Sequence, residues 1–337
     1  MYEKFFQLEK TPFSTVPNPE CVYFAGQHAD AIGGLVFGVL SRKGYLVLTG
    51  EAGLGKTTAL SAMSHLMGQS SVQTSLILNP ILTGPEFMEM ALLNFGFKEI
   101  PVSKAQRLKM FQDFLIRSDA EGKVTALVID EAHKLSAELL EEIRLLGNFE
   151  ASDHKLLQMV LVGQPELNDR LNLPELWQLK QRIAIRMSLA RMDRETVADY
   201  LIFRWSKASA TGPMPFTEGA IDAIATWSKG IPRLINAICD NALLIAFSDA
   251  TRVVEVRHIR EACKELDLAT SVIRPRFDHL SPEVPKQPLM DEFGDLEGAE
   301  PNATTRDADR GEDPQFWIEQ RPSLLKRWTG MGQKEKG

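Results

Sequence analysis

Apolar positions in the first half of the chain predict short strands that alternate with helices. The stretch VTALVI at residues 124–129 is apolar and β-branched almost throughout, which is typical of a strand buried on both faces of a parallel sheet. Similar stretches lie at residues 45–49, 72–78, 156–163 and, with the character of an edge strand, 183–189. Helical spacing fills intervals at residues 84–95, 103–120 and 136–150. This alternation predicts an α/β fold with a parallel sheet.

The stretch at 136–150 shows how the pattern orients one helix. Leu139, Ile143 and Leu146 recur at helical spacing, which predicts one apolar stripe along the helix. Ser136 precedes them and is expected to cap the N-terminus, because its hydroxyl can accept a free backbone N–H there.

After about residue 192 the strand-like stretches stop, and the pattern predicts a small all-helical domain. Its segments are MDRETVADYLIFRWSKAS, TEGAIDAIATWSKG, PRLINAICDNALLIAFS and VRHIREACKELDLA. Pro232 follows Gly230 closely, as a proline in the first turn of a helix does. We therefore expect a core with an N-terminal extension at residues 1–190, the helical domain at 191–269, and a tail at 270–337.

The tail changes in composition and in charge. Residues 280–320 hold 11 acidic and three basic residues, whereas residues 321–337 hold five basic and one acidic. Sparse periodicity with many Pro, Gly and acidic residues predicts that most of the tail is disordered. The segment 314–328 is expected either to be solvated or to dock on a partner groove or an anionic membrane surface. Docking would use Trp317, Leu324, Leu325 and Trp328, flanked by Arg321, Lys326 and Arg327.

The segment GEAGLGKT at residues 50–57 carries the first candidate chemistry. It matches the P-loop pattern G-x-x-x-x-G-K-[ST] and lies between a predicted strand and a predicted helix, as the pattern requires. Its glycines let backbone amides surround phosphates at a helix N-terminus. Lys56 is expected to reach the β- and γ-phosphates of ATP, and Thr57 to ligate Mg²⁺. The expected nucleotide-binding residues are Gly50, Glu51, Ala52, Gly53, Leu54, Gly55, Lys56, Thr57 and Thr58.

The letters DEAH at residues 130–133 supply the expected partners of the P-loop. Asp130 ends a buried strand and is placed to hold the Mg²⁺ shell. Glu131 can polarise the attacking water as general base. His133 is expected to be a solvated or capping side chain. The same letters spell a helicase signature, but a helicase of that type needs a second ATPase-like lobe, and no second array of alternating strands and helices follows.

Three polar residues further along the chain complete the predicted site. Gln164 follows the predicted strand LLQMVLVG at residues 156–163, where its side chain can contact the γ-phosphate and the lytic water. Arg182 stands just before the last strand, where it can reach a neighbouring subunit and stabilise transition-state charge. Arg233 stands in the first turn of a helix and can fold onto the nucleotide. Both arginines have the alternative of being surface charges.

Overall charge and cysteine content exclude several classes of protein. The net charge of −7 argues mildly against broad coating of a nucleic-acid backbone. Three cysteines without metal spacing predict buried or incidental thiols in a reducing compartment. The charged N-terminus, broken by Pro12, is no signal peptide, and no apolar run is long enough to span a bilayer. We expect a cytoplasmic protein, in solution or peripheral on the inner membrane.

Several segments together resemble AAA+ ATPases of the ExeA/GspA-like general secretion family. They are YEKFFQLEKTPFSTVPNPECVYF, GEAGLGKTT, LILNP, VIDEAHKLSAELLEEIRLLGNFE, LQMVLVGQPEL, LKQRI and GIPRLIN. The resemblance covers about residues 1–268 and implies a five-stranded parallel sheet with a helical lid, ATP-dependent self-association and work on a cell-envelope assembly. It implies that Gln164 is sensor 1, Arg182 the arginine finger and Arg233 sensor 2.

The chain also departs from that family. Related sequences often read DEAQNL where this one reads DEAHKL. Secretion members commonly continue into a transmembrane helix and a peptidoglycan-binding domain, and this chain is expected to be a stand-alone member without them. The preferred hypothesis is an ATPase that drives or switches a secretion, pilus or exopolysaccharide system, with an envelope-assembly protein as partner. The alternatives are a DNA-binding regulator of transposition and a scaffold that binds nucleotide without hydrolysis.

Overall fold

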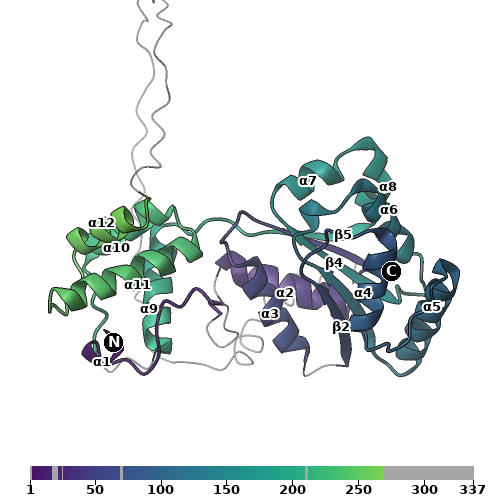
Figure 1. The fold of residues 1–337 in the computed structure, drawn as a ribbon, viewed down its shortest axis with the longest axis horizontal. Helices are drawn as coiled ribbons and strands as arrows, with labels where there is room; N and C mark the ends of the chain where they lie inside the picture. The colour runs from purple at the N-terminus through teal and green to yellow at the C-terminus, as the bar shows by residue number, and fades with distance from the viewer. Residues whose placement is uncertain (1, 17–21, 25, 69–70, 209–211, 269–337) are drawn as a thin grey trace, which may run out of the picture. The chain divides into compact units, whose positions relative to one another are not determined.

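The structure is a computed structural model that describes residues 2–16, 22–24, 26–68, 71–208 and 212–268 (Figure 1). These ranges belong to one compact unit of the chain. The predicted disorder of residues 270–337, the docking segment 314–328 and Cys21 lie outside the described residues. The other two cysteines, Cys239 and Cys263, are buried free thiols, as expected.

Five parallel strands form the central sheet, in the order β2-β3-β4-β1-β5. They are β1 Tyr45–Thr49, β2 Val72–Ile77, β3 Val124–Ile129, β4 Leu157–Gly163 and β5 Ile183–Ser188. Every residue of β1, β3 and β4 is buried, whereas β5 at the edge alternates between exposed positions and positions that are buried or half-buried. The predicted α/β class, the strand number and the edge position of the last strand are confirmed.

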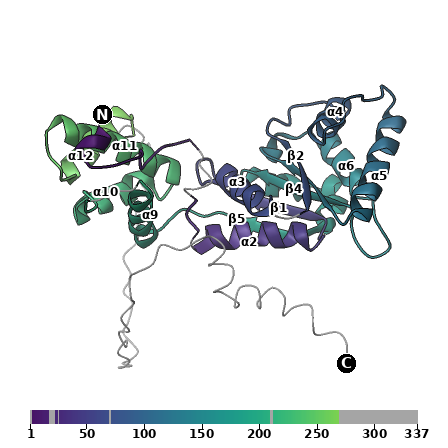
Figure 2. The same cartoon turned by 90° about the horizontal axis from the view of Figure 1, so that it is seen from below.

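Helices cover both faces of this sheet (Figure 2). They are α2 Gly26–Leu40, α3 Lys56–Met67, α4 Gly84–Asn94, α5 Lys104–Ala120, α6 Ala137–Leu146, α7 Glu166–Leu171 and α8 Trp177–Arg182. Side chains alternate across each strand, so Leu46 and Leu48 of β1 pack in one hydrophobic cluster with α2 and α3. Tyr45 and Val47 pack in another cluster with α4, α5 and α6. The sheet is therefore buried on both faces.

Helix α2 was not predicted from the sequence. Its glycines weaken the helical pattern, yet Gly38 has a packing reason: a Cβ there would lie 2.0 Å from Leu46 Cδ2. Glycine lets the helix lie directly on β1. For α6 the prediction is confirmed, because Ser136 accepts the Leu139 N–H at 3.1 Å and the stripe of Leu139, Ile143 and Leu146 is buried. The helix ends at Leu146, earlier than expected, and Gly147 follows as its C-cap.

Four helices form the second part, here called the helical lid. They are α9 Arg194–Lys207, α10 Glu218–Ser228, α11 Pro232–Ser248 and α12 Val256–Glu265. Asp193 caps α9 by accepting the Thr196 N–H, and Thr217 caps α10 by accepting the Ala220 N–H. Pro232 occupies the first turn of α11, as predicted.

The N-terminal residues pack with the helical lid. Tyr2 and Phe6, in and just after the short helix α1 Tyr2–Phe5, share a hydrophobic cluster with residues of α9, α10, α11 and α12. The buried guanidinium of Arg204 on α9 donates hydrogen bonds to the carbonyl oxygens of Pro12 (2.7 Å) and Ser14 (3.0 Å). Within the described ranges, no helix is both long and apolar enough to cross a membrane.

Candidate nucleotide-binding site

The P-loop connects the end of β1 at Thr49 with the start of α3 at Lys56, as predicted. Gly53 and Gly55 have φ values of 82° and 93°, which side chains other than glycine rarely adopt. A Cβ on Gly53 would also lie 2.9 Å from Ile231 Cγ2. The loop therefore needs glycine for its backbone shape and for its approach to the helical lid.

Lys56 is only 7% exposed although it is charged. Its Nζ donates hydrogen bonds to the carbonyl oxygens of Gly50 (2.7 Å) and Glu51 (2.9 Å), inside the loop. Burial lowers the pKa of this ammonium, and the carboxylates of Glu131 and Asp130 oppose that shift. Loop carbonyls thus hold the lysine as a desolvated cation. When a nucleotide binds, phosphate oxygens can replace these carbonyls as acceptors of the lysine's hydrogen bonds.

Thr57 and Asp130 meet at the C-terminal ends of the strands. Asp130 follows β3 and is 5% exposed. Its Oδ2 accepts a hydrogen bond from Thr57 Oγ1 at 3.2 Å, and its Oδ1 accepts the Glu131 backbone N–H at 2.8 Å. Mg²⁺ in nucleotide sites takes one or two protein oxygens and completes its octahedron with phosphates and water. One hydroxyl and one carboxylate fit that requirement.

Glu131 stands beside this pair with its backbone in the left-handed region, at φ 54°. Its Oε2 lies 3.0 Å from Lys134 Nζ and 3.6 Å from His133 Nε2. Burial raises the pKa of the Glu131 carboxyl, but the hydrogen bond from Lys134 and the nearby cationic charges bring it below its ordinary value. The carboxylate is therefore ionised at neutral pH and able to accept a proton.

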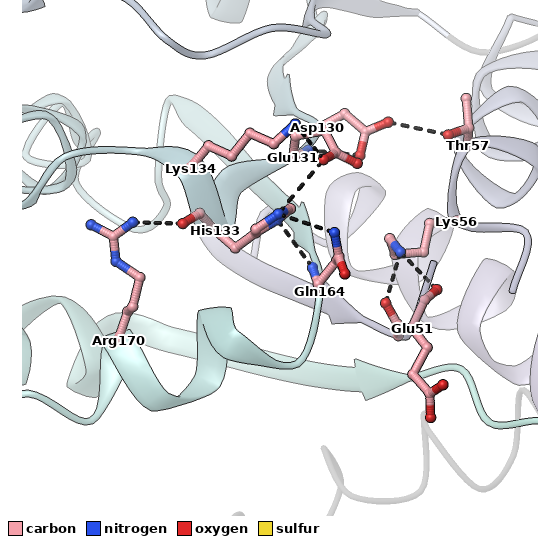
Figure 3. A network of polar contacts seen from close by, with 10 residues as sticks. Glu51, Lys56, Thr57, Asp130, Glu131, His133, Lys134, Gln164 and Arg170 are labelled. Atoms are coloured by element: carbon pink, nitrogen blue, oxygen red, sulfur yellow. Dashed lines mark hydrogen bonds and ion pairs between the residues drawn. The ribbon is translucent and has the colours of Figure 1, made fainter. Parts of the chain in front are cut away.

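His133 lies between Glu131 and Gln164 (Figure 3). The Gln164 backbone N–H donates to His133 Nδ1 at 3.3 Å, and the side-chain amide nitrogen of Gln164, Nε2, lies 3.2 Å from His133 Nε2. The prediction of a solvated or capping His133 is wrong, because the side chain is 13% exposed and contacts two other site residues. Strands β3 and β4 are neighbours, so the residues that follow them lie side by side.

The two predicted arginines lie near opposite ends of the strands. Arg233 lies at the P-loop, where its backbone N–H donates to the Gly53 carbonyl at 3.2 Å and its side chain is exposed. Arg182 precedes β5, whose start pairs with the start of β1, far along the strands from the P-loop. It donates to the Arg144 carbonyl (3.0 Å) and to Asn148 Oδ1 (2.6 Å). Arg182 therefore takes no part in the P-loop site of its own chain.

Two contacts of the P-loop were not predicted from the sequence. His28 on α2 donates from Nε2 to the Leu54 carbonyl at 2.8 Å, and burial lowers the pKa of its imidazole. Arg191, between β5 and α9, forms an ion pair of 2.6 Å with Glu51. Both partners are distant in sequence and belong to no motif, so no sequence signal distinguishes them. Of the remaining predicted residues, Leu54 is buried, Thr58 is half-buried and Ala52 is exposed.

Comparison with known proteins agrees with this geometry. Residues 39–171 match the AAA domain family. General secretion pathway protein A of Aeromonas hydrophila is 39% identical over 252 residues, which make up 74% of this chain and 45% of that protein. An uncharacterized HTH-type transcriptional regulator of Methanocaldococcus jannaschii is 26% identical over 204 residues, 58% of this chain and 48% of that protein. The chain spans about half the length of these relatives.

Solved structures share the fold at low sequence identity. Cdc6p from Pyrobaculum aerophilum superposes with a TM-score of 0.59 at 17% identity, over 75% of this chain and 70% of that one. ORC2 from Aeropyrum pernix, in ADPNP–ADP complexes, gives 0.56 at 17% identity, over 81% and 75%. The sheet, the P-loop and the helical lid thus define a P-loop protein of the AAA+ class. More particularly, the chain is an ExeA/GspA-like AAA+ protein, similar to general secretion pathway protein A over most of its own length.

Proposed function

We propose that this chain binds Mg²⁺–ATP at the P-loop and hydrolyses it to ADP and phosphate. The observation that carries the proposal is the hydrogen bond of 3.2 Å between Thr57 Oγ1 and Asp130 Oδ2. It joins the two protein oxygens that would hold Mg²⁺, next to Lys56 as a phosphate partner and Glu131 as a proton acceptor. A P-loop followed by this carboxylate pair is the arrangement that phosphoryl transfer to water uses.

In the proposed reaction, Glu131 takes a proton from the attacking water while the water oxygen forms a bond to the γ-phosphorus. The bond from that phosphorus to the β–γ bridging oxygen breaks, and ADP leaves with the electron pair. Bound Mg²⁺ would neutralise charge on the phosphate oxygens. Gln164 donates to the γ-phosphate and orients the water, and Arg233 folds onto the nucleotide from the first turn of α11.

Binding and hydrolysis can be tested separately. ATP affinity is measured by titration with a fluorescent ATP analogue and Mg²⁺, and turnover by phosphate release. Lys56→Ala is expected to lose binding. Glu131→Gln is expected to bind with unchanged affinity and to lose about a hundredfold or more in turnover, the usual contribution of a general base. Wild-type turnover by Glu131→Gln would refute the assignment of the base.

We further propose that hydrolysis occurs in a homo-oligomer in which Arg182 acts on the neighbouring subunit's nucleotide. The position of Arg182 beyond the reach of its own P-loop supports this arrangement, since an arginine finger supplied in trans stabilises transition-state charge. ATP would order the interface between subunits, and hydrolysis would release it. The oligomer would thus be a switch or a motor.

For its cellular role we propose assembly work at the cell envelope, in a secretion, pilus or exopolysaccharide system, on the cytoplasmic side of the inner membrane. Similarity to general secretion pathway protein A supports this role. The Glu131→Gln protein, held in its ATP state, is used to capture partners from the native lysate. Recovery of inner-membrane assembly proteins supports the proposal, whereas recovery of DNA with a recombinase would favour control of transposition instead.

A further inference from the structure

The two ring nitrogens of His133 have different partners, and this difference fixes the tautomer. The Gln164 backbone N–H points at Nδ1 over 3.3 Å. A backbone N–H can only donate, so Nδ1 is the acceptor and carries no proton. In a neutral imidazole the proton then resides on Nε2. His133 therefore presents an N–H donor on the side of the ring that faces Glu131 and the Gln164 side chain.

This donor also fixes the orientation of the Gln164 amide. His133 Nε2 lies 3.2 Å from the amide nitrogen, Nε2, of Gln164 (Figure 3) and 3.6 Å from Glu131 Oε2. Two N–H donors cannot share a hydrogen bond in this orientation. The oxygen and nitrogen of an amide are distinguished only by their hydrogen bonds. Because His133 donates here, this tautomer requires the Gln164 amide to be turned from the orientation drawn in Figure 3, so that its oxygen takes the place of its nitrogen next to the ring. The NH₂ group of Gln164 then points away from His133 and keeps its protons for a phosphate oxygen.

The backbone of His133 is itself held in place. His133 lies in a short 3-10 turn, Ala132–Lys134, directly after Glu131. Arg170 on α7 donates to the His133 carbonyl at 2.5 Å. On the opposite side, a Cβ on Gly163 would lie 3.1 Å from the His133 backbone nitrogen and 3.4 Å from Nδ1. The glycine at the end of β4 thus allows the close approach of the ring.

We propose that His133 is a positioning residue for ATP hydrolysis. Its imidazole holds the Gln164 amide in the orientation in which the NH₂ group can donate to a phosphate oxygen, and it keeps this amide beside the Glu131 carboxylate. The inference rests on the proposed hydrolysis. The His133 ring lies between Gln164, which would contact the γ-phosphate, and the Glu131 carboxylate, which would receive the proton from water. In this role His133 would act through Gln164 and Glu131, without itself contacting the phosphate or the water.

A substitution series separates this role from packing. His133→Gln retains one acceptor and one donor, whereas His133→Leu has neither and fills a similar volume. We expect His133→Leu to lower kcat by about tenfold or more, as loss of a residue that orients site groups does, with ATP affinity within about twofold of wild type. His133→Gln is expected to recover most of the lost kcat. Equal loss in both variants, or loss of ATP affinity in parallel with kcat, would assign His133 to packing only.

Coupling to Gln164 gives a second readout. In a Gln164→Ala background the amide to be oriented is gone, so adding His133→Leu should cost less than about twofold more in kcat. Additive losses overturn the inference. Histidine ¹⁵N spectra at pH 8, assigned to His133 by comparison with His133→Gln, should show an unprotonated Nδ1. A protonated Nδ1 overturns the inference whatever the activity.

The proposed function and this inference fail in different ways. If wild type releases no phosphate from Mg²⁺–ATP, the proposed function fails, and the positioning role fails with it. If wild type hydrolyses ATP and His133→Leu does so at the same rate, the inference alone is refuted and the ATPase assignment stands.

Discussion

Lys134 Nζ lies 3.0 Å from Oε2 of Glu131, three residues earlier in the same turn. The lysine contacts the proposed general base directly. Its hydrogen bond and its charge are the main causes that lower the Glu131 pKa against the effect of burial. Lys134 thus keeps the base ionised, and at the same time it holds the carboxylate that must receive the proton from water.

Removing this cation should alter the pH dependence of turnover. In Lys134→Met the hydrogen bond and the charge of Lys134 are lost, while burial and the smaller lowering contributions of His133 and Lys56 remain, so the Glu131 pKa rises. A base works only when unprotonated, so the acid limb of the kcat profile should move to higher pH. Phosphate release measured from pH 4 to pH 9 tests this, with Lys109→Met as a control, because Lys109 pairs with Asp113 instead. An acid limb that stays in place would show that Lys134 does not set the ionisation of the base.

Gly53→Ala should damage the contact between the P-loop and the helical lid. The residue has φ 82°, and its new Cβ would lie 2.9 Å from Ile231 Cγ2 and 3.1 Å from Arg233 Cβ. Strain of this kind costs about 1–3 kcal/mol, so the melting temperature and the ATP affinity should both fall. Gly33→Ala is the matched control, since its Cβ meets nothing within 4 Å and helix α2 should tolerate it. Equal behaviour of the two variants would contradict the role of Gly53.

Arg182 can be tested by mixing two inactive proteins. Arg182→Ala keeps an intact P-loop, and Lys56→Ala keeps an intact Arg182. If the arginine acts in trans, mixed oligomers contain sites with a working P-loop and a neighbouring arginine. Their phosphate release should exceed the sum of the two separate proteins several-fold, within the large contribution known for arginine fingers. If Arg182→Ala is nearly as active as wild type, the role of Arg182 is limited to its hydrogen bonds with Arg144 and Asn148.

Arg204→Met should loosen the N-terminal residues from the helical lid. The buried guanidinium donates to the carbonyls of Pro12 and Ser14. Its loss removes this donor from the Pro12 carbonyl and leaves the Ser14 carbonyl with the longer bond of 3.4 Å from Asn236 Nδ2. Hydrogen bonds from a charged group contribute about 1.5–3 kcal/mol. We expect a decrease of that size in unfolding free energy and faster proteolysis near the N-terminus. Lys207→Met is the control, because Lys207 lies over the ring of Phe203 on an exposed face. Unchanged proteolysis would argue that Arg204 does not hold the N-terminal residues on the helical lid.

Local chemistry in the sequence accounts for the parts of the fold and site that could be predicted. The buried run at 124–129 became β3 without change of boundaries, and the P-loop lies between its strand and helix because glycine pattern, strand and helix are contiguous. Helix α2 escaped because the tertiary contact of Gly38 with Leu46 overrides poor helix propensity. The spacing of apolar residues cannot reveal that a helix needs glycine where a strand packs closely against it.

The contacts within the site were harder to predict for a related reason. His133 and Gln164 are 31 residues apart and meet only because β3 and β4 pair. Hydrophobic pattern gives the strands but not their order. A histidine at a helix start therefore looks solvated until the order is known. The ionic contact between Glu51 and Arg191, 140 residues apart, is of the same kind.

The N-terminal packing makes the first described residues part of the hydrophobic cluster of the helical lid. Tyr2, Phe6 and Phe13 lie in that cluster, whereas Ile32 and Leu35, which follow them in the sequence, lie in the cluster of the sheet. The lid therefore completes its core with residues from the opposite end of the sequence. A truncation that removes residues 2–16 would expose apolar surface on the lid, although the sheet follows these residues in the chain.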